Sequence, residues 1–209
     1  PCRLEATRFP GKPLTLIHGT AMVEWVYRHA RQVSSIDRLV VATDSPRIMG
    51  YVKDFGGEAL MTSAECQSGT DRAYETSRIL SQQGDNYDLV INIQGDEPAM
   101  HPSVIEQVID MATQNKTFDI ITAACSFERS VDIFNHNMVK VIIDIARRAL
   151  YFSRSPIPFI RGNQPFLPTS LNPSLLAHFH CHLGIYAYRT NALARFAGLP
   201  IDPIENLEK

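Results

Sequence analysis

Short apolar runs alternate along the chain with segments whose apolar residues recur at helical spacing. The β-branched run at 39–43 ends at Asp44-Ser45-Pro46, which predicts a buried strand followed by a turn. Apolar spacing in 21–33 predicts a helix before this strand, and 47–55 predicts a helix after it that stops at two glycines. The alternation indicates an α/β fold in which helices cover both faces of a sheet.

Further apolar runs predict four more strands, at 89–93, 120–125, 139–143 and 183–188. Ser103 stands three residues before Glu106, which is the spacing of a capping box, so we expect a helix to begin near Val104. Strands that alternate with helices favour a largely parallel sheet whose successive strands are joined by right-handed crossovers. The stretch 156–173 departs from this pattern because it holds five prolines, and we expect a long functional loop there.

Composition narrows the class of protein. The 209 residues are 44% hydrophobic and 20% charged, which suits one domain with its own core. A formal net charge of −2 gives no general attraction to nucleic acid or anionic lipid, although a local basic cluster is compatible with phosphate binding. The four cysteines form no C-x-x-C pair, which is typical of reduced thiols in a cytosolic protein. No apolar run approaches the roughly 20 residues that a membrane-spanning helix needs.

One basic cluster lies near the start of the sequence, where Arg3, Arg8 and Lys12 surround a glycine between two prolines. The glycine lets backbone N–H groups approach an anion, and the prolines restrict the loop on either side. Three cations on so short a loop predict a phosphate site, with an ordinary exposed basic loop as the alternative. The loop is not a P-loop, because Ala6 and Pro13 occupy positions that require glycine and serine or threonine.

A carboxylate, Asp96, follows the strand expected at 89–93. In open α/β sheets, ligands bind outside the carboxyl ends of the strands. Mg²⁺ takes few protein carboxylates and completes its octahedron with phosphate oxygens and water. Asp96 is therefore a candidate Mg²⁺ ligand, with a tight turn at Gly95-Asp96 as the alternative.

The segment Gln67-Ser68-Gly69-Thr70-Asp71-Arg72 combines small and hydrogen-bonding residues just before an expected helix. Its backbone groups and hydroxyls are candidates for reading the edge of a nucleotide base. The alternative is purely local, with Asp71 capping the helix.

Taken in order, these segments resemble the family of 3-deoxy-manno-octulosonate cytidylyltransferases, the CMP-Kdo synthetases of bacterial lipopolysaccharide synthesis. The resemblance begins with the loop from Pro1 to Leu14 and covers essentially the whole chain. It rests further on Val41-Ala42-Thr43-Asp44, Met61-Thr62, Gln67 to Arg72, Asn92 to Pro98, Val139-Lys140-Val141, Tyr151-Phe152-Ser153-Arg154, Ile157-Pro158 and His182-Leu183-Gly184-Ile185-Tyr186.

The resemblance implies roles for individual residues. It implies that Arg3, Lys12 and Asp96 are catalytic and that Asp96 holds the metal ion. The residues that it assigns to the nucleotide are Arg3, Arg8, Lys12, Gln67, Ser68, Gly69, Thr70, Arg72 and Asp96. Those that it assigns to the sugar are Gln94, Arg154, His182, Tyr186 and Glu205.

The resemblance also implies a fold and a reaction. The fold would be a Rossmann-like three-layer nucleotidyltransferase fold with a mostly parallel central sheet, forming one domain over 1–209 with a dimerisation excursion around 150–190. The reaction would join CTP to Kdo, giving CMP-Kdo and pyrophosphate, with Mg²⁺ as cofactor, in a cytoplasmic homodimer that binds neither nucleic acid nor membrane. A sugar nucleotidyltransferase with another acceptor, such as one of CMP-sialate type, and a non-catalytic nucleotide-binding relative are the alternatives.

Two further features bear on the sugar and on a candidate metal site, and the second competes with the sugar-binding role that the resemblance gives to His182. Cys181 stands where the family commonly has a basic residue, so the affinity for Kdo could differ in this protein. Three histidines occupy alternate positions, His178, His180 and His182. On a strand they would share one face, so a zinc site formed by three imidazoles is a further hypothesis.

The ends of the sequence also differ from the family pattern, in which an apolar strand precedes the first loop and a further metal-binding aspartate follows. We therefore expect the natural protein to be longer at both ends. We also expect this 209-residue stretch by itself to be inactive or unstable.

Overall fold

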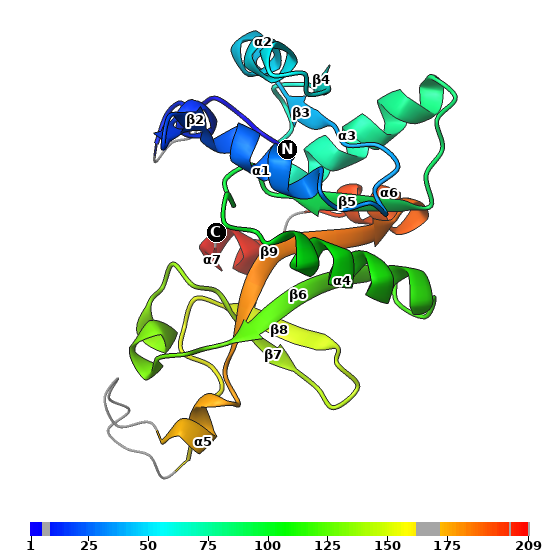
Figure 1. Ribbon diagram of the computed structural model, residues 1–209. Coiled ribbons are helices and arrows are strands. Elements are labelled where there is room, and N and C mark those ends of the chain that lie inside the picture. The colour runs from blue at the N-terminus through cyan, green and yellow to red at the C-terminus, as the bar shows by residue number, and fades with distance from the viewer. Residues whose placement is uncertain (6–8, 162–171, 201, 209) are drawn as a thin grey trace. The chain divides into compact units, whose positions relative to one another are not determined.

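The computed structural model describes residues 1–5, 9–161, 172–200 and 202–208. The chain forms two compact units, shown together in Figure 1. Unit 1 comprises Pro1–Ile121 and Gly184–Leu199, and unit 2 comprises Thr122–Leu183 and Pro200–Lys209. No helix in the described part of the chain has both the length and the apolar character needed to cross a membrane.

Unit 1 begins with short elements that frame its first loop. These are the 3-10 helix η1 (Lys12–Leu14), the antiparallel strands β1 (Leu16–Ile17) and β2 (Thr20–Ala21), and helix α1 (Met22–Ala30). A β-α-β element follows, in which β3 (Val41–Thr43) pairs in parallel with β4 (Ala59–Met61) and α2 (Pro46–Asp54) connects them. Ser45 caps α2 by accepting the N–H of Ile48. The predicted helices at 21–33 and 47–55 and the strand at 39–43 are therefore confirmed, with slightly different ends.

The second part of unit 1 carries the longest helices. It contains α3 (Gly69–Gln82), β5 (Leu89–Ile93), α4 (Pro102–Gln114), the start of β6 (Ile120–Ser126), the end of β9 (His180–Arg189) and α6 (Thr190–Ala197). Helix α3 packs against β3 and β5, so it spans the strands from both parts of the unit. Strand β5 pairs antiparallel with β9, with Ile93 opposite Ile185 and Leu89 opposite Arg189.

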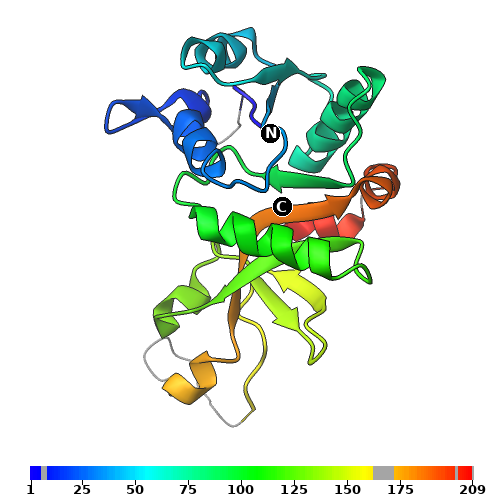
Figure 2. The ribbon, with the colours of Figure 1, turned by 45° about the vertical axis from the view of Figure 1, so that its right-hand side comes forward.

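Unit 2 is built around an antiparallel hairpin of β7 (Lys140–Ile143) and β8 (Ala149–Ser153), coloured yellow-green and yellow in Figure 2. The start of β9 pairs with β7, with Cys181 opposite Lys140. The smaller elements of this unit are η2 (Ser130–Phe134), α5 (Pro173–Leu176) and α7 (Pro203–Glu208). Its core is formed by Phe127, Ile133, Phe179 and Cys181.

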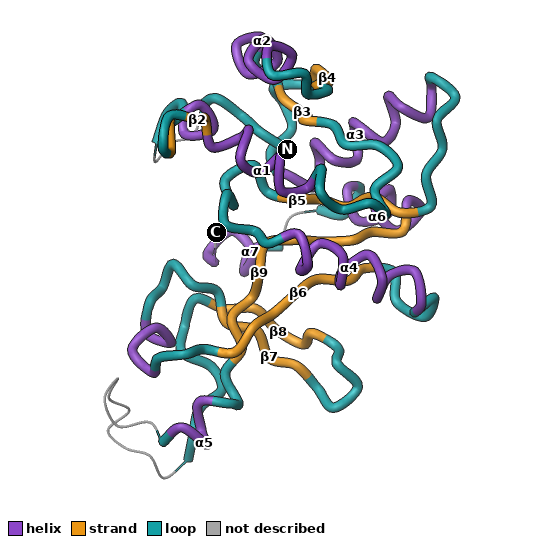
Figure 3. Tube along the Cα trace, viewed as in Figure 1, coloured by secondary structure: helices purple, strands orange, loops and turns teal. Residues whose placement is uncertain are grey.

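The expectation of a largely parallel sheet is met in part. Among the described strands, β3 and β4 pair in parallel, whereas the pairs β5–β9, β7–β8 and β7–β9 are antiparallel. Alternation of strands and helices predicts crossovers, but it does not reveal that β9 runs antiparallel to both β5 and β7. The α/β class is confirmed, and Figure 3 shows its strands and helices along the trace.

Two details of the sequence interpretation need correction or extension. Helix α4 begins at Pro102, and its N-cap is His101, whose Nδ1 accepts the N–H of Ser103, so the predicted cap at Ser103 is wrong. A proline at the first helical position needs no hydrogen-bond partner for its nitrogen, which favours the earlier start. Strands β4 and β8 were not predicted, because β4 has three residues and the five residues of β8 are mostly exposed.

The backbone at Pro1 and Cys2 connects β3 with the loop that follows β5. The Cys2 N–H donates to the Ala42 carbonyl at 2.8 Å, and the Gly95 N–H donates to the Pro1 carbonyl at 3.2 Å. A cavity of about 570 Å³ lies beside this bridge, lined by residues of β3 and β5. Asn92, 1% exposed on β5, lines it, and its side-chain amide has no hydrogen-bond partner among the described residues.

Candidate functional site

The first loop presents Lys12 at the start of η1. Gly11 precedes it in the left-handed region at φ +75°, a conformation that glycine adopts without a steric penalty. The Gly11 N–H donates to the Leu4 carbonyl at 2.8 Å, which closes the loop, and Pro13 restricts the backbone inside η1. Arg8, predicted in the same loop, lies outside the described residues.

Lys12 meets Asp96 across 84 positions of sequence, with Nζ 2.7 Å from Oδ2. The two side chains remain 36% and 49% exposed, so both charges stay accessible to a ligand. Asp96 lies in the loop that follows β5, at the carboxyl end of the strand as expected. The Lys12 ammonium and the Asp96 carboxylate therefore lie side by side in a polar, solvent-accessible site.

Gly95 allows the loop that carries Asp96 to lie against the start of the chain. A Cβ at this position would stand 2.0 Å from the Cys2 Sγ and 2.8 Å from the Pro1 carbonyl oxygen. Any larger residue would push this loop away from Pro1 and Cys2. Asp96 is thus placed by close backbone packing as well as by its ion pair.

The amino end of α3 forms another wall of the site. Ser68 is the N-cap: its Oγ accepts the Asp71 N–H at 3.0 Å, and the Asp71 carboxylate accepts the Ser68 N–H at 2.8 Å. The reciprocal pair is a capping box, so Asp71 is its third helical residue and not the cap itself. A helix N-terminus has a partial positive charge that favours an anion, so this end of α3 suits a polar, phosphate-bearing ligand.

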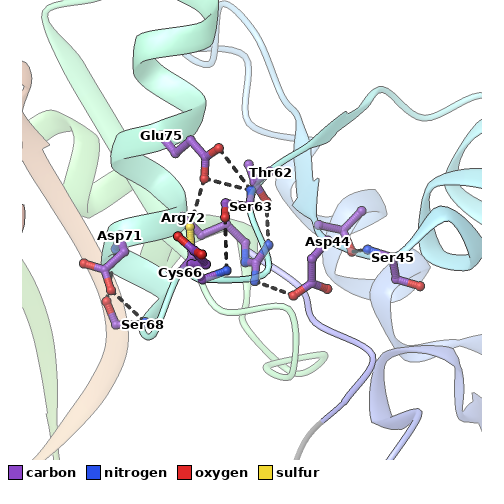
Figure 4. Close-up of polar contacts among 11 residues, drawn as sticks. Asp44, Ser45, Thr62, Ser63, Cys66, Ser68, Asp71, Arg72 and Glu75 are labelled. Atoms are coloured by element: carbon purple, nitrogen blue, oxygen red, sulfur yellow. Dashed lines mark hydrogen bonds and ion pairs between the residues drawn. The ribbon is translucent and has the colours of Figure 1, made fainter.

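Arg72 lies beneath this wall with its side chain 3% exposed. Its guanidinium donates to the Asp44 carboxylate at 2.7 Å and to the Thr62 hydroxyl at 2.5 Å, as Figure 4 shows. Asp44 follows β3 and Thr62 follows β4, so Arg72 ties the ends of both strands to α3. A buried charge needs such partners, because desolvation without compensation is costly.

These elements enclose a pocket of about 230 Å³. The predicted residues that line it are Arg3, Lys12, Gln67, Ser68, Gly69, Arg72, Gln94 and Asp96. The structure thus brings together three basic residues (Arg3, Lys12 and Arg72), one carboxylate and the loop before α3. Thr70 does not line the pocket: its hydroxyl lies 3.3 Å from the hydroxyl of Tyr188.

Sequence reasoning missed five residues of the pocket wall. They are Pro1, Cys2, Pro13, Cys66 and Gly95. Each stands within two positions of a predicted site residue in the sequence, so proximity was the available signal, but only the fold shows that they line the pocket.

The residues assigned to the sugar are divided between the units. Tyr186 lies in unit 1, stacked on Tyr188 with ring centroids 5.8 Å apart, and burial raises the pKa of its hydroxyl to about 12. It therefore stays protonated at neutral pH. Arg154 and His182 lie in unit 2, and Glu205 lies on α7, where its side chain falls outside the described residues.

The two residues in unit 2 have defined local partners. Arg154 donates to the His136 carbonyl at 2.9 Å. His182 pairs with the Thr122 hydroxyl through Nε2 at 2.9 Å and packs edge-on against Phe152. Burial lowers its pKa to about 4, so His182 is neutral at physiological pH. Cys181 next to it is buried in the core of unit 2.

Among the described residues that line the pocket, Asp96 is the one carboxylate suited to Mg²⁺. Asp96 is half exposed and stands beside a cationic loop, which fits an ion held by one protein carboxylate together with phosphate oxygens and water. No group of three or more His, Cys, Asp or Glu side chains within the described ranges is placed to hold a metal ion. The zinc hypothesis for the three alternating histidines therefore has no geometric support in that part of the chain.

Comparison with known proteins places this arrangement in a family. The model of a protein family described as Cytidylyltransferase matches residues 1–209. The 3-deoxy-manno-octulosonate cytidylyltransferase of Syntrophobacter fumaroxidans is 43% identical over 209 residues, which cover all of this chain and 79% of that protein. An 8-amino-3,8-dideoxy-manno-octulosonate cytidylyltransferase of a Shewanella species is 40% identical over 210 residues, covering all of this chain and 80% of that protein.

A solved structure supports the same relationship. A CMP:2-keto-3-deoxy-manno-octonic acid synthetase in complex with CTP superposes with a TM-score of 0.84 and 35% sequence identity. The match covers all of this chain and 79% of that one.

Proposed function

Because this chain belongs to the cytidylyltransferase family, we propose that it transfers the cytidylyl group of CTP to 3-deoxy-manno-octulosonate (Kdo), giving CMP-Kdo and pyrophosphate. The observation that carries the proposal is one pocket that gathers Arg3, Lys12 and Asp96 with the loop before α3. Cations and a carboxylate suit a metal-bound triphosphate, and the loop suits a base and a ribose. The solved relative was obtained in complex with CTP, which supports CTP as the nucleotide.

The proposed reaction is an in-line displacement at the α-phosphorus of CTP. The anomeric hydroxyl of the sugar acid forms the new oxygen–phosphorus bond, and the bond to the pyrophosphate breaks. Such a transfer depends mainly on positioning and charge neutralisation, and it needs no protein nucleophile. Lys12 and Arg3 would neutralise the α-phosphate and the departing pyrophosphate, while the first turn of α3 would orient the nucleoside.

Asp96 is the residue that would hold Mg²⁺ in this proposal. When bound, the ion would supply further neutralisation of the phosphate charge. The Lys12–Asp96 ion pair holds the carboxylate beside one of the cations proposed to bind the phosphates. The contacts of Arg8 and Thr70 with the nucleotide remain part of the proposal, together with those of Gln67, Ser68, Gly69 and Arg72.

The acceptor side is proposed from the family resemblance. Gln94 lines the pocket beside Asp96, and Tyr186 lies in the same unit. Arg154, His182 and Glu205 would complete the sugar site. We further propose a cytoplasmic homodimer that serves lipopolysaccharide synthesis, with dimer contacts in the region 150–190.

The finer description of the fold also belongs to this proposal. We propose one nucleotidyltransferase domain of Rossmann-like, three-layer type with a mostly parallel central sheet. The parallel pairing of β3 with β4 and the backbone bridge from Ala42 through Pro1 to Gly95 support it.

Release of pyrophosphate tests the proposed function directly. The protein in its natural full length is assayed with CTP or UTP, combined with Kdo, 8-amino-Kdo or a sialic acid, in the presence of Mg²⁺. We expect turnover with CTP and Kdo and at least tenfold lower kcat/KM with UTP. Binding of CTP without turnover on any acceptor would favour a non-catalytic relative and contradict the proposal.

A second candidate differs only in the acceptor. The Shewanella relative named for 8-amino-3,8-dideoxy-manno-octulosonate is almost as similar as the relatives named for Kdo. The same assay decides between them, because the preferred sugar is the one with the higher kcat/KM. A preference for sialic acid would exclude both.

A further inference from the structure

The loop from Ser63 to Ser68 joins β4 to α3 and supplies part of the pocket wall. Cys66, Gln67 and Ser68 line the pocket, and Figure 3 shows the segment as loop between a strand and a helix. Such a connection has no ladder of backbone hydrogen bonds, so something else must hold its shape. Its far end is fixed by the capping box at Ser68.

Glu75, one turn into α3 beyond Asp71, holds the other end of this loop. Its two carboxylate oxygens accept the backbone N–H of Ser63 at 3.0 and 2.9 Å. One of the same oxygens accepts the thiol of Cys66 at 2.9 Å. Figure 4 shows Glu75 facing the loop from the helix side, with Cys66 between it and Ser68.

The Cys66 thiol is suited to donate this hydrogen bond. Burial, together with the hydrogen bond to Glu75, raises its pKa to about 12, so the thiol is protonated at physiological pH. A protonated thiol has one donor, and the carboxylate accepts it. Hydrogen bonds to a charged acceptor are stronger than those between neutral groups.

We propose that Glu75 is a positioning residue for the nucleotide, which acts through Ser63 and Cys66 to hold the 63–68 loop in its binding shape. Glu75 does not line the pocket itself, so its effect on the nucleotide is indirect. The proposal rests on the function proposed above, and it concerns the nucleotide side of the site alone.

Replacing Glu75 with alanine releases Ser63 and Cys66 together. We expect the KM for CTP to rise about tenfold, which corresponds to the loss of one or two hydrogen bonds to a charged group. The kcat and the KM for the sugar should stay within about threefold of the wild type. In E75Q the amide oxygen still accepts one donor, so its KM for CTP should rise only about threefold.

Variants of Cys66 separate the effect of its thiol from that of the Ser63 N–H, which Glu75 also accepts. C66A should raise the KM for CTP about threefold, and C66S should raise it less than C66A because its hydroxyl donates in the same way. The double variant E75A/C66A should lose little beyond E75A, since the thiol donates its hydrogen bond to the carboxylate that E75A already removes. Glu106→Ala is the matched control, because Glu106 is an exposed glutamate on another helix.

The outcomes distinguish this proposal from the proposed function. Wild-type turnover reports on the function, whereas the ratio of each variant to the wild type, measured also as CTP affinity by calorimetry, reports on the loop. An E75A protein that melts within a few degrees of the wild type and binds CTP with unchanged affinity would overturn the proposal. Parallel losses in kcat and in both KM values would indicate a general structural role and would equally overturn it.

Discussion

Two ion pairs in unit 1 have the same nitrogen–oxygen distance of 2.7 Å but very different surroundings. The side chains of Arg72 and Asp44 are 3% and 18% exposed, whereas those of Lys12 and Asp96 are 36% and 49% exposed. A buried pair cannot be separated without leaving a desolvated charge, but an exposed pair exchanges its partner for water or a ligand at little cost. The first pair therefore supports the site, and the second is available for chemistry.

The largest effect is expected from breaking the buried pair. Arg72→Ala leaves the Asp44 carboxylate without its cation, and we expect the free energy of unfolding to fall by about 3–5 kcal/mol. Denaturant unfolding, followed by circular dichroism, measures the change.

Arg129 provides the matched control for that prediction. It pairs with Asp132 at the same distance of 2.7 Å, but its side chain is 72% exposed. We expect Arg129→Ala to cost less than about 1 kcal/mol. Equal losses in the two variants would show that burial does not decide the difference.

Breaking the exposed pair should affect activity and spare the fold. Lys12→Ala and Asp96→Ala remove groups proposed to hold the triphosphate, so turnover should fall at least about 100-fold, an effect of the size seen when catalytic electrostatic groups are removed. The free energy of unfolding should change by less than about 1 kcal/mol. Activity within threefold of the wild type in either variant would sink the assignment of this pocket.

A smaller effect is expected at the first turn of α3, which carries both Arg72 and the pocket wall. Ser68→Ala removes the N-cap acceptor and one half of the capping box, so stability should fall by about 1 kcal/mol. Thermal unfolding of this variant beside Ser103→Ala, whose side chain is not an N-cap, measures the difference. A loss at Ser103 as large as that at Ser68 would contradict the observed helix starts.

The smallest effect is expected from salt. Raising the ionic strength from about 0.05 to 0.5 M screens exposed charges, so the KM for CTP should rise several-fold. The stability difference between the wild type and Arg72→Ala should stay constant within about 0.5 kcal/mol, because buried pairs are screened much less. A salt-dependent stability difference would mean that water reaches Arg72.

Some features of the candidate site follow from residues close together in the sequence, and others depend on contacts between distant segments. The sequence placed Asp96 after a strand and Lys12 on a basic loop, and both placements are confirmed. It did not indicate that the pair would meet, nor that Glu75 and Cys66 would hold the loop between β4 and α3. Neither is encoded in local spacing, because each depends on where the separate segments come to lie.

The sequence by itself determined the longer elements of unit 1, including the strand at 89–93, whose bounds agree with β5, and the helices on both sides of β3. These follow from hydrophobic periodicity and turn residues, which act within a few positions of the chain. Tertiary structure alone decided that β9 runs antiparallel to β5 and that Arg72 is buried while Lys12 is exposed. The physical reason is that strand pairing and desolvation depend on which distant segments pack together, and a local pattern does not specify its partner.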